Sequence, residues 1–325
     1  MEPASELTPE LRAFVEFVAK KGRELYRDLP WRRTYDPYAI WISEVMLQQT
    51  QVSRVDGRWQ RWLERFPTVD ALAAAAPSDV LEEWQGLGYN RRALSVHRAA
   101  QAISEAGGIF PQDPKELVKL PGIGPATAAG IRAFAFNLHG VYLETNVRTV
   151  FLHELYPQAE GVPDSELVPL VELTCPASVA DAVNADRADS AANVVDADGA
   201  ANVADADSAA NVATAELTPR SWYYALLDYG AYLKKTIPNP SRRSKSHVKQ
   251  THFEGSHRQK RAELLRVLLA HKDEGGAVFE TLHQELCQIE VNAGRETLDE
   301  QVTLGLLEEL AKEGFCQKND EYWLP

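Results

Sequence analysis

The stretch Leu120-Pro-Gly-Ile-Gly-Pro-Ala-Thr-Ala-Ala129 places two glycines and two prolines between helical segments. It predicts the end of one helix, a tight turn, and a second helix that begins at the second proline. Gly122 and Gly124 let the backbone approach a ligand closely. The N–H groups of Ala126 and Thr127, at the start of the second helix, suit a phosphate. A plain corner between two helices fits the same pattern, so both interpretations stay open.

Helical periodicity continues on both sides of this corner. Apolar residues recur at helical spacing, strand-like alternation is scarce, and the connections are short and carry Pro or Gly. A first helix is expected to start at Pro9, because Thr8 before it is a good cap. The pattern predicts an all-α body with further helices over 38–53, 55–65, 69–74, 77–84, 90–106, 113–118, 125–137, 145–155 and 219–235.

The composition divides the chain into parts. From about 176 to 216 nearly all residues are Ala, Asp, Asn, Val or Ser, with a nine-residue repeat, which predicts a disordered insertion because no core can form. Near the end, three helical segments precede a turn at Asn319-Asp320, a pattern typical of a winged helix. The predicted parts are a helical body (1–172), the insertion (173–217), a returning helix of the body (218–237), a basic linker (238–258) and a winged-helix-like domain (259–325).

Composition also limits the compartment and the cofactors. The 325 residues include no apolar run long enough for a membrane helix. Three widely spaced cysteines, Cys175, Cys287 and Cys316, exclude a disulfide framework and a cysteine-only metal site, which favours a reducing cytoplasm. The eight histidines show no spacing typical of metal ligands, so no metal is predicted.

The net charge of −13 hides an uneven distribution. Residues 272–325 hold thirteen acids and four bases, whereas the segment from Arg242 to Arg261 holds seven Lys and Arg residues against one glutamate. This composition permits a DNA partner without requiring one. The acidic tail argues against groove binding and favours packing or protein contacts. The DNA-facing exception would be the first helix of the tail, with Arg258, Lys260, Arg261 and Arg266.

Three further motifs carry a resemblance. Leu29-Pro-Trp-Arg-Arg33, the run from Asp36 to Val52 with Ser-Glu-Val-Met-Leu-Gln-Gln-Thr-Gln at its end, and Trp84-Gln-Gly-Leu-Gly-Tyr-Asn90 resemble the helix-hairpin-helix (HhH-GPD) DNA glycosylases. The MutY-type adenine glycosylases are the most similar group. The resemblance spans roughly 25–157 and resumes at 221–234. It implies a two-lobed all-α body that holds DNA between its lobes, with the target nucleotide flipped out of the duplex.

The resemblance assigns roles to single residues. Glu44 corresponds to the acid that protonates the leaving base and directs water, with a solvent-facing helix carboxylate as the alternative. Trp31 and Arg32 correspond to residues that line the base pocket. Gln49 corresponds to a residue that enters the duplex, and Tyr89 to an aromatic wedge in the base stack. For Trp31 and Tyr89 the alternative is simple core packing.

Two departures from the family pattern concern catalysis. Glu144 replaces the aspartate that stabilises the cationic sugar, so the carboxylate is kept with one more methylene. Ala126 stands where strand-cleaving relatives have a Schiff-base lysine, which predicts a water nucleophile and no lyase step.

A third departure concerns the iron-sulfur cluster of the family. Lys234 stands at the first of its four cysteine positions, and no cysteine follows until Cys287, so we expect no cluster and no cofactor. The connector that fills its place carries Arg242, Arg243 and Lys245, which would bind DNA phosphates unless they only solvate a linker.

Together these features predict a monofunctional DNA glycosylase of base-excision repair that removes a mispaired base, with adenine as the first candidate. Its partner would be double-stranded DNA with a mispaired or damaged base, and the protein would be monomeric and cytoplasmic, associated with the nucleoid. Thymine, uracil or an alkylated purine are alternative substrates. A non-catalytic protein that binds DNA lesions is the alternative from another class.

Overall fold

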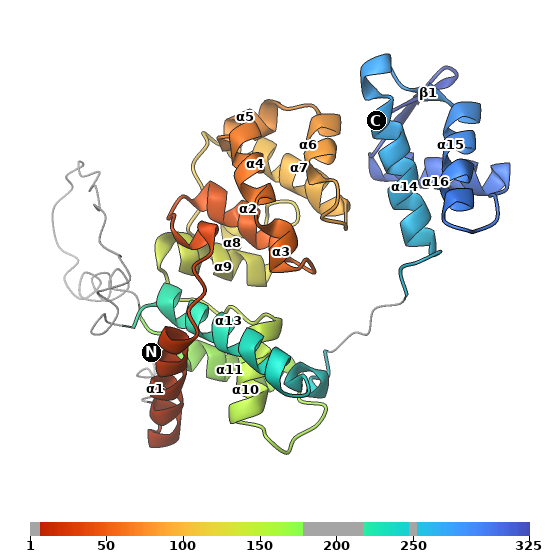
Figure 1. The fold of residues 1–325 in the computed structure, drawn as a ribbon. Helices are drawn as coiled ribbons and strands as arrows, with labels where there is room; N and C mark the ends of the chain where they lie inside the picture. Colours follow the sequence, from red (N-terminus) through yellow and green to blue (C-terminus); the bar gives the residue numbers. More distant parts are fainter. Residues whose placement is uncertain (1–6, 178–216, 247–251) are drawn as a thin grey trace. The chain divides into compact units, whose positions relative to one another are not determined.

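The computed structural model describes residues 7–177, 217–246 and 252–325 (Figure 1). The chain divides into two compact units. Unit 1 comprises Met1–Ile40 and Gly124–Val248, and unit 2 comprises Trp41–Ile123 and Lys249–Pro325. The described residues are mostly helical, so the predicted fold class is confirmed. Nearly all of the predicted low-complexity insertion lies outside the described residues.

Unit 1 is a helical body built around one long helix, α13. This helix packs against α1, α9 and α10, and it contributes Trp222, Tyr223 and Leu226, whose side chains are fully buried. Gly230 of α13 lies directly against the backbone of Asn146, where a Cβ atom would collide with that residue. The elements of unit 1 are α1 (Pro9–Glu24), η1 (Pro30–Arg32), α9 (Pro125–Phe136), α10 (Thr145–Glu154), α11 (Asp164–Thr174), α13 (Pro219–Thr236) and η2 (Pro240–Arg243).

Unit 2 contains a second helical body with an aromatic core. Helix α7 packs against α5 and α6, and the buried rings of Trp62 and Trp84 meet edge to face with centroids 5.5 Å apart. Helix α2 (Pro37–Leu47) passes from unit 1 into this body. The other helices are α3 (Val52–Val55), α4 (Arg58–Arg65), α5 (Val69–Ala74), α6 (Pro77–Trp84), α7 (Arg91–Glu105) and α8 (Pro114–Leu117).

The C-terminal part of unit 2 has the predicted three helices and hairpin. Helix α14 packs against α15 and α16, and Asp320, with φ of +52°, makes the turn of the hairpin. A short strand that was not predicted, β1, joins the sheet in the order β1-β3-β2, with antiparallel pairing throughout. The elements are α14 (His257–Ala270), η3 (Lys272–Glu274), β1 (Ala277–Val278), α15 (Phe279–Asn292), α16 (Glu300–Glu313), β2 (Gln317–Asn319) and β3 (Tyr322–Leu324).

Two helix predictions were wrong in their extent, and one helix was not predicted. The single helix expected over 38–53 is interrupted, because Gln49 has a left-handed backbone with φ of +57°. The helix expected from residue 55 begins at Arg58, because Gly57 has φ of +79°. Helix α11 was missed, since Pro169 inside it interrupts the pattern that a helix normally shows. No helix among the described residues is long and apolar enough to cross a membrane.

Candidate functional site

Glu44 lies on α2, the most buried helix of the chain's N-terminal half. Its neighbours Trp41 and Val45 are 0% and 3% exposed, and Glu44 itself is partly buried. This partial burial agrees with the predicted acid, whose role stays a prediction alongside the solvent-facing alternative.

Glu144 is the N-cap of α10. Its Oε1 accepts hydrogen bonds from the backbone N–H groups of Asn146 at 2.6 Å and Val147 at 3.1 Å. Lys234 of α13 donates from Nζ to Oδ1 of Asn146 at 2.8 Å. Burial raises the pKa of Glu144, whereas the charge of Lys234 and the two N–H donors act in the opposite direction. Lys234, which stands where the family has its first cluster cysteine, is thus a cation that favours the ionised form of Glu144.

Gln49 and Tyr89 lie in two loops of unit 2 with strained backbones. Their φ angles are +57° and +50°, a region that non-glycine residues rarely adopt. Both side chains are exposed, and Tyr89 retains 43% of its surface. Strain at two exposed side chains is typical of functional loops. The exposure also shows that core packing, the alternative interpretation of Tyr89, does not hold in this structure.

Arg92 connects these two loops, and the sequence analysis missed it. One amino group donates to the carbonyls of Val45 at 2.5 Å and Gln48 at 2.6 Å, and the other donates to those of Leu87 at 3.2 Å and Gly88 at 3.0 Å. Burial lowers the pKa of Arg92 to about 10, so it remains charged at neutral pH. Its position directly behind the Gly88-Tyr89-Asn90 turn was the available signal.

The glycine-rich corner has the predicted geometry. Gly122 has φ of +76°, and α9 begins at Pro125 with Gly124 as its N-cap. Gly124 has no side chain with which to cap the helix, so Ala126 and Thr127 place their N–H groups in an uncapped first turn. Thr127 as a whole residue is 7% exposed, and a phosphate contact of its N–H group stays a prediction.

Trp31 and Arg32 are buried in unit 1, with exposures of 4% and 6%. The guanidinium group of Arg32 pairs with both carboxylate oxygens of Asp228, at 2.7 Å and 2.8 Å, and lies 4.3 Å from the ring centroid of Tyr224. Arg32 therefore has a structural role in this conformation. For Trp31 the packing alternative agrees with its burial, and a contact with a base stays a prediction for both residues.

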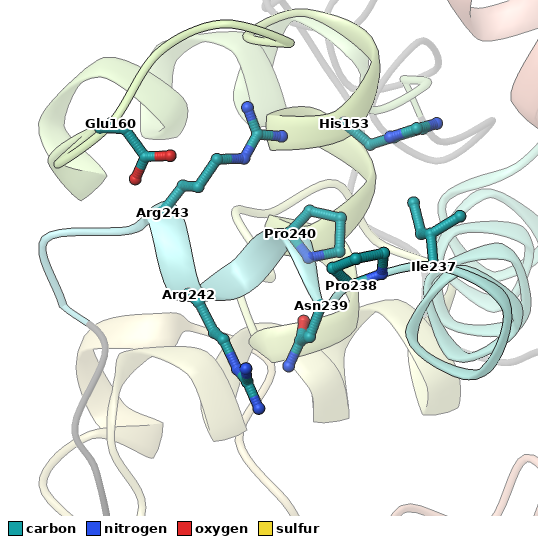
Figure 2. Close-up of a pocket in the computed structure, with 8 residues that line it drawn as sticks. All are labelled: His153, Glu160, Ile237, Pro238, Asn239, Pro240, Arg242 and Arg243. Carbon is teal, nitrogen blue, oxygen red and sulfur yellow. The ribbon is translucent and has the colours of Figure 1, made fainter.

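The connector after α13 divides its basic residues between two roles (Figure 2). Arg243 is turned inward and donates to the carbonyls of Tyr156 at 2.5 Å and Leu152 at 2.7 Å, at the end of α10. This corrects the expected phosphate contact of Arg243, because its guanidinium group binds the protein. Arg242 and Lys245 are exposed. Arg242 borders a pocket of about 400 Å³ with His153, Glu160, Ile237, Pro238, Asn239, Pro240 and Arg243.

The same connector does not fit an iron-sulfur cluster. Residues 234–246 contain no cysteine, and the amine of Lys234 is bonded to Asn146. A parallel bridge between Val162 and Ser244, with the N–H of Lys245 donating to the Val162 carbonyl at 3.0 Å, closes the connector onto the body. No group of His, Cys, Asp or Glu side chains in the described parts of the chain is arranged to hold a metal ion.

Comparison with known proteins shows the family of the chain. Residues 42–216 match the HhH-GPD superfamily of base excision DNA repair proteins, and the chain belongs to this superfamily. Within it, the chain is similar to the adenine DNA glycosylase of Mycolicibacterium smegmatis, with 42% identity over 152 residues, 46% of this chain and 52% of that relative. The adenine DNA glycosylase of Buchnera aphidicola subsp. Baizongia pistaciae is 41% identical over 127 residues, 39% of this chain and 36% of that relative. The predicted resemblance to MutY-type enzymes is confirmed.

These matches cover only part of each relative. The chain spans about half the length of the first of these relatives. The fold is also similar to that of a solved thermostable thymine-DNA glycosylase, with a TM-score of 0.53, 19% identity, and coverage of 71% of this chain and 90% of that one. At this identity the solved structure supports the helical architecture alone.

Proposed function

We propose that the protein is a DNA glycosylase that hydrolyses the N-glycosidic bond of a flipped, mispaired adenine in double-stranded DNA. The observation that carries the proposal is the position of Glu44, a partly buried residue on the apolar helix α2, inside the segment that matches the HhH-GPD superfamily, in a chain similar to adenine DNA glycosylases. In the proposed reaction this glutamate is the acid that donates a proton to the leaving base.

The remaining roles follow from the side chains in place. Glu44 gives its proton to the departing adenine as the C1′–N bond breaks, and the resulting Glu44 carboxylate then takes a proton from the water that adds to C1′. The Glu144 carboxylate stabilises the cationic sugar. Gln49 and Tyr89, on their strained loops, fill the vacated stack, and the corner at Gly122 holds a backbone phosphate.

Several further properties belong to the same proposal. Ala126 offers no amine for a Schiff base, so the enzyme has no lyase step. It works without a cofactor, as a monomer, on nucleoid DNA in the cytoplasm. Arg242 and Lys245, both exposed, add phosphate contacts from the connector.

Single-turnover base release tests the proposal. Duplexes with A:8-oxoguanine, A:G, T:G, U:G or an alkylated purine are incubated with the wild type, Glu44→Gln and Glu144→Gln, with and without alkali. We expect adenine release that needs alkali for strand scission and that falls at least about a hundredfold in both variants. Glu64→Gln, on the exposed side of α4, is the matched control and should release adenine at the wild-type rate.

A second candidate, a lesion-binding protein without turnover, is favoured by one observation. Burial raises the pKa of Glu144, and a protonated carboxyl would not stabilise a cationic sugar. Tight binding of mispaired duplexes with no release from any of them, in the wild type as in Glu144→Gln, would support this candidate and contradict the first.

A further inference from the structure

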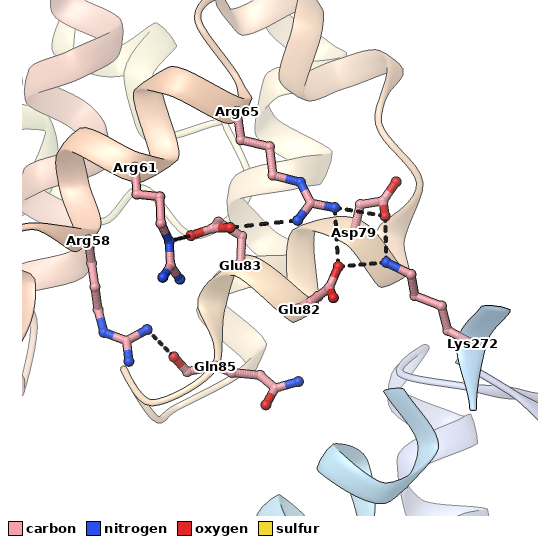
Figure 3. A network of polar contacts seen from close by, with 8 residues as sticks. All are labelled: Arg58, Arg61, Arg65, Asp79, Glu82, Glu83, Gln85 and Lys272. Carbon is pink, nitrogen blue, oxygen red and sulfur yellow. Dashed lines mark hydrogen bonds and ion pairs between the residues drawn. The ribbon is translucent and has the colours of Figure 1, made fainter. Parts of the chain in front are cut away.

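The winged-helix-like domain contacts the helical body of unit 2 through charged side chains. Nζ of Lys272 lies 2.9 Å from Oδ1 of Asp79 and 2.5 Å from Oε2 of Glu82, both on α6 (Figure 3). At the end of α16, Glu313 pairs with Arg91 of α7 at 2.5 Å. These two contacts hold the domain against α6 and against the start of α7.

The contact with α6 is a network rather than a single pair. Arg65 lies 3.0 Å from Asp79 and 3.2 Å from Glu82, so two cations share two carboxylates. Lys272, whose side chain is 17% exposed, lowers the pKa of both carboxyls. A partly buried network resists screening by salt better than an isolated surface pair.

Acidic residues of α16 pair with Arg261 and His257 at the start of α14. Arg261 pairs with Glu309 at 2.6 Å and with Glu313 at 2.8 Å, and His257 lies 3.3 Å from Glu309. Arg258 differs, because among the described residues it forms no ion pair. The charge of Arg258 therefore remains available to an external anion.

Arg258 lies between two exposed aromatic rings. Its guanidinium carbon is 5.2 Å from the ring centroid of Phe253 and 5.9 Å from that of Tyr89. The rings are 47% and 43% exposed. Aromatic faces stack on bases of any sequence, and a guanidinium group over a ring keeps its N–H edge free for a phosphate. An acidic peptide would use the charge of Arg258 alone, whereas a nucleic acid uses both the charge and the aromatic faces.

We propose that Tyr89, Arg258 and Phe253 form a DNA-contact surface to which the winged-helix-like domain contributes. Arg258 binds a backbone phosphate, and Phe253 stacks on a base of the distorted duplex beside Tyr89. The proposal rests on the proposed function for the position of Tyr89 next to the flipped nucleotide. Through Arg258 and Phe253, the winged-helix-like domain would bind distorted DNA despite its acidic net charge.

Binding of the full chain to DNA tests this surface directly. The probe is a duplex with a tetrahydrofuran abasic analogue, titrated by fluorescence anisotropy over a series of salt concentrations. We expect Arg258→Ala to weaken binding about tenfold and to reduce the slope of log Kd against log salt by about one. Phe253→Ala should weaken binding about tenfold with an unchanged slope. Lys318→Ala removes the same charge from β2 and should leave both quantities unchanged.

The docking network offers a second, independent arm. Lys272→Glu faces Asp79 and Glu82 with a like charge, and should weaken binding about as much as Arg258→Ala. Adding Glu82→Lys recreates an opposite pair and should restore binding. Recovery in the double variant shows that the loss came from docking and not from misfolding.

The outcomes separate this inference from the proposed function. If Arg258→Ala binds DNA as Lys318→Ala does, the surface does not contact DNA and belongs to a protein partner, and the inference is overturned. If the wild type releases no base while the pattern of affinities holds, the proposed function fails and the DNA-contact surface stands.

Discussion

At the level of single residues, the chain departs from the family pattern at Glu144, which stands in place of an aspartate. Asp is a better N-cap than Glu, yet Glu144 caps α10 through two N–H groups. Burial opposes its ionised form, and the cation of Lys234 supports it. The longer side chain of Glu144 therefore still reaches two backbone N–H groups. Lys234, which stands where the family has a cysteine, favours its ionised form.

Lys234→Met tests this dependence. Glu144 must be ionised to stabilise a cationic sugar, so base release is lost as the pH falls through its raised pKa. Removing the charge of Lys234 raises that pKa further, and the acid limb of the pH–rate profile should move to higher pH. Lys235→Met, on the exposed neighbouring position, should leave the profile in place. An unmoved profile in Lys234→Met would show that this lysine does not control Glu144.

Among the elements, the corner between α8 and α9 depends on two glycines for different reasons. Gly122 has φ of +76°, and a Cβ atom there would lie 2.6 Å from Cβ of Ser95. Gly124 has φ of −85°, and a Cβ atom there would meet open space. Backbone conformation and packing both require a glycine at position 122, whereas neither requires one at position 124.

Alanine substitution distinguishes the two glycines. Gly122→Ala should lower the free energy of unfolding by about 2–4 kcal/mol, through the left-handed backbone and the collision with Ser95. Gly124→Ala should change it by less than about 1 kcal/mol. Urea denaturation of both variants measures the difference. Equal losses would mean that the corner is not held in the conformation described.

For the molecule as a whole, the connector 237–246, which contains no cysteine, is attached to the helical body by its own hydrogen bonds. Arg243 closes the end of α10 by binding the carbonyls of Leu152 and Tyr156, and the Val162–Ser244 bridge adds a second attachment. Protein hydrogen bonds to a charged group thus stabilise the segment in which the family places its metal ligands.

Stability measurements check this arrangement. Chelator treatment should leave the thermal midpoint unchanged, since the connector holds no thiolate ligands. Arg243→Ala should lower the free energy of unfolding by about 2–3 kcal/mol, because buried carbonyls lose charged donors. Arg242→Ala, exposed and adjacent, should cost less than about 0.5 kcal/mol. A chelator-sensitive midpoint would contradict the proposed absence of a cofactor.

Much of this architecture could be read from local patterns along the chain. Caps, prolines and glycines act within a few residues, which is why the helices over 69–74 and 77–84 and the hairpin turn at Asp320 were located correctly. The family motifs also pointed to Glu44 and to the corner at Gly122. The same local rules failed at Gln49, whose left-handed backbone ends the helix, and at Pro169, which lies inside a helix.

Long-range pairing could not be read in this way. Arg32 and Arg243 are both arginines in basic segments. Only the tertiary structure shows that Arg32 pairs with Asp228, 196 positions away. It also shows that Arg243 donates to carbonyl groups at the end of α10. Arg258 lies in an equally basic run. The acids of α16 pair with Arg261, whereas Arg258 lies over the ring of Tyr89. The sequence settles which residue types, helices and motifs are present, because these depend on neighbours in the chain. The fate of each charge depends on partners that the chain brings together only on folding, and it follows from the tertiary structure.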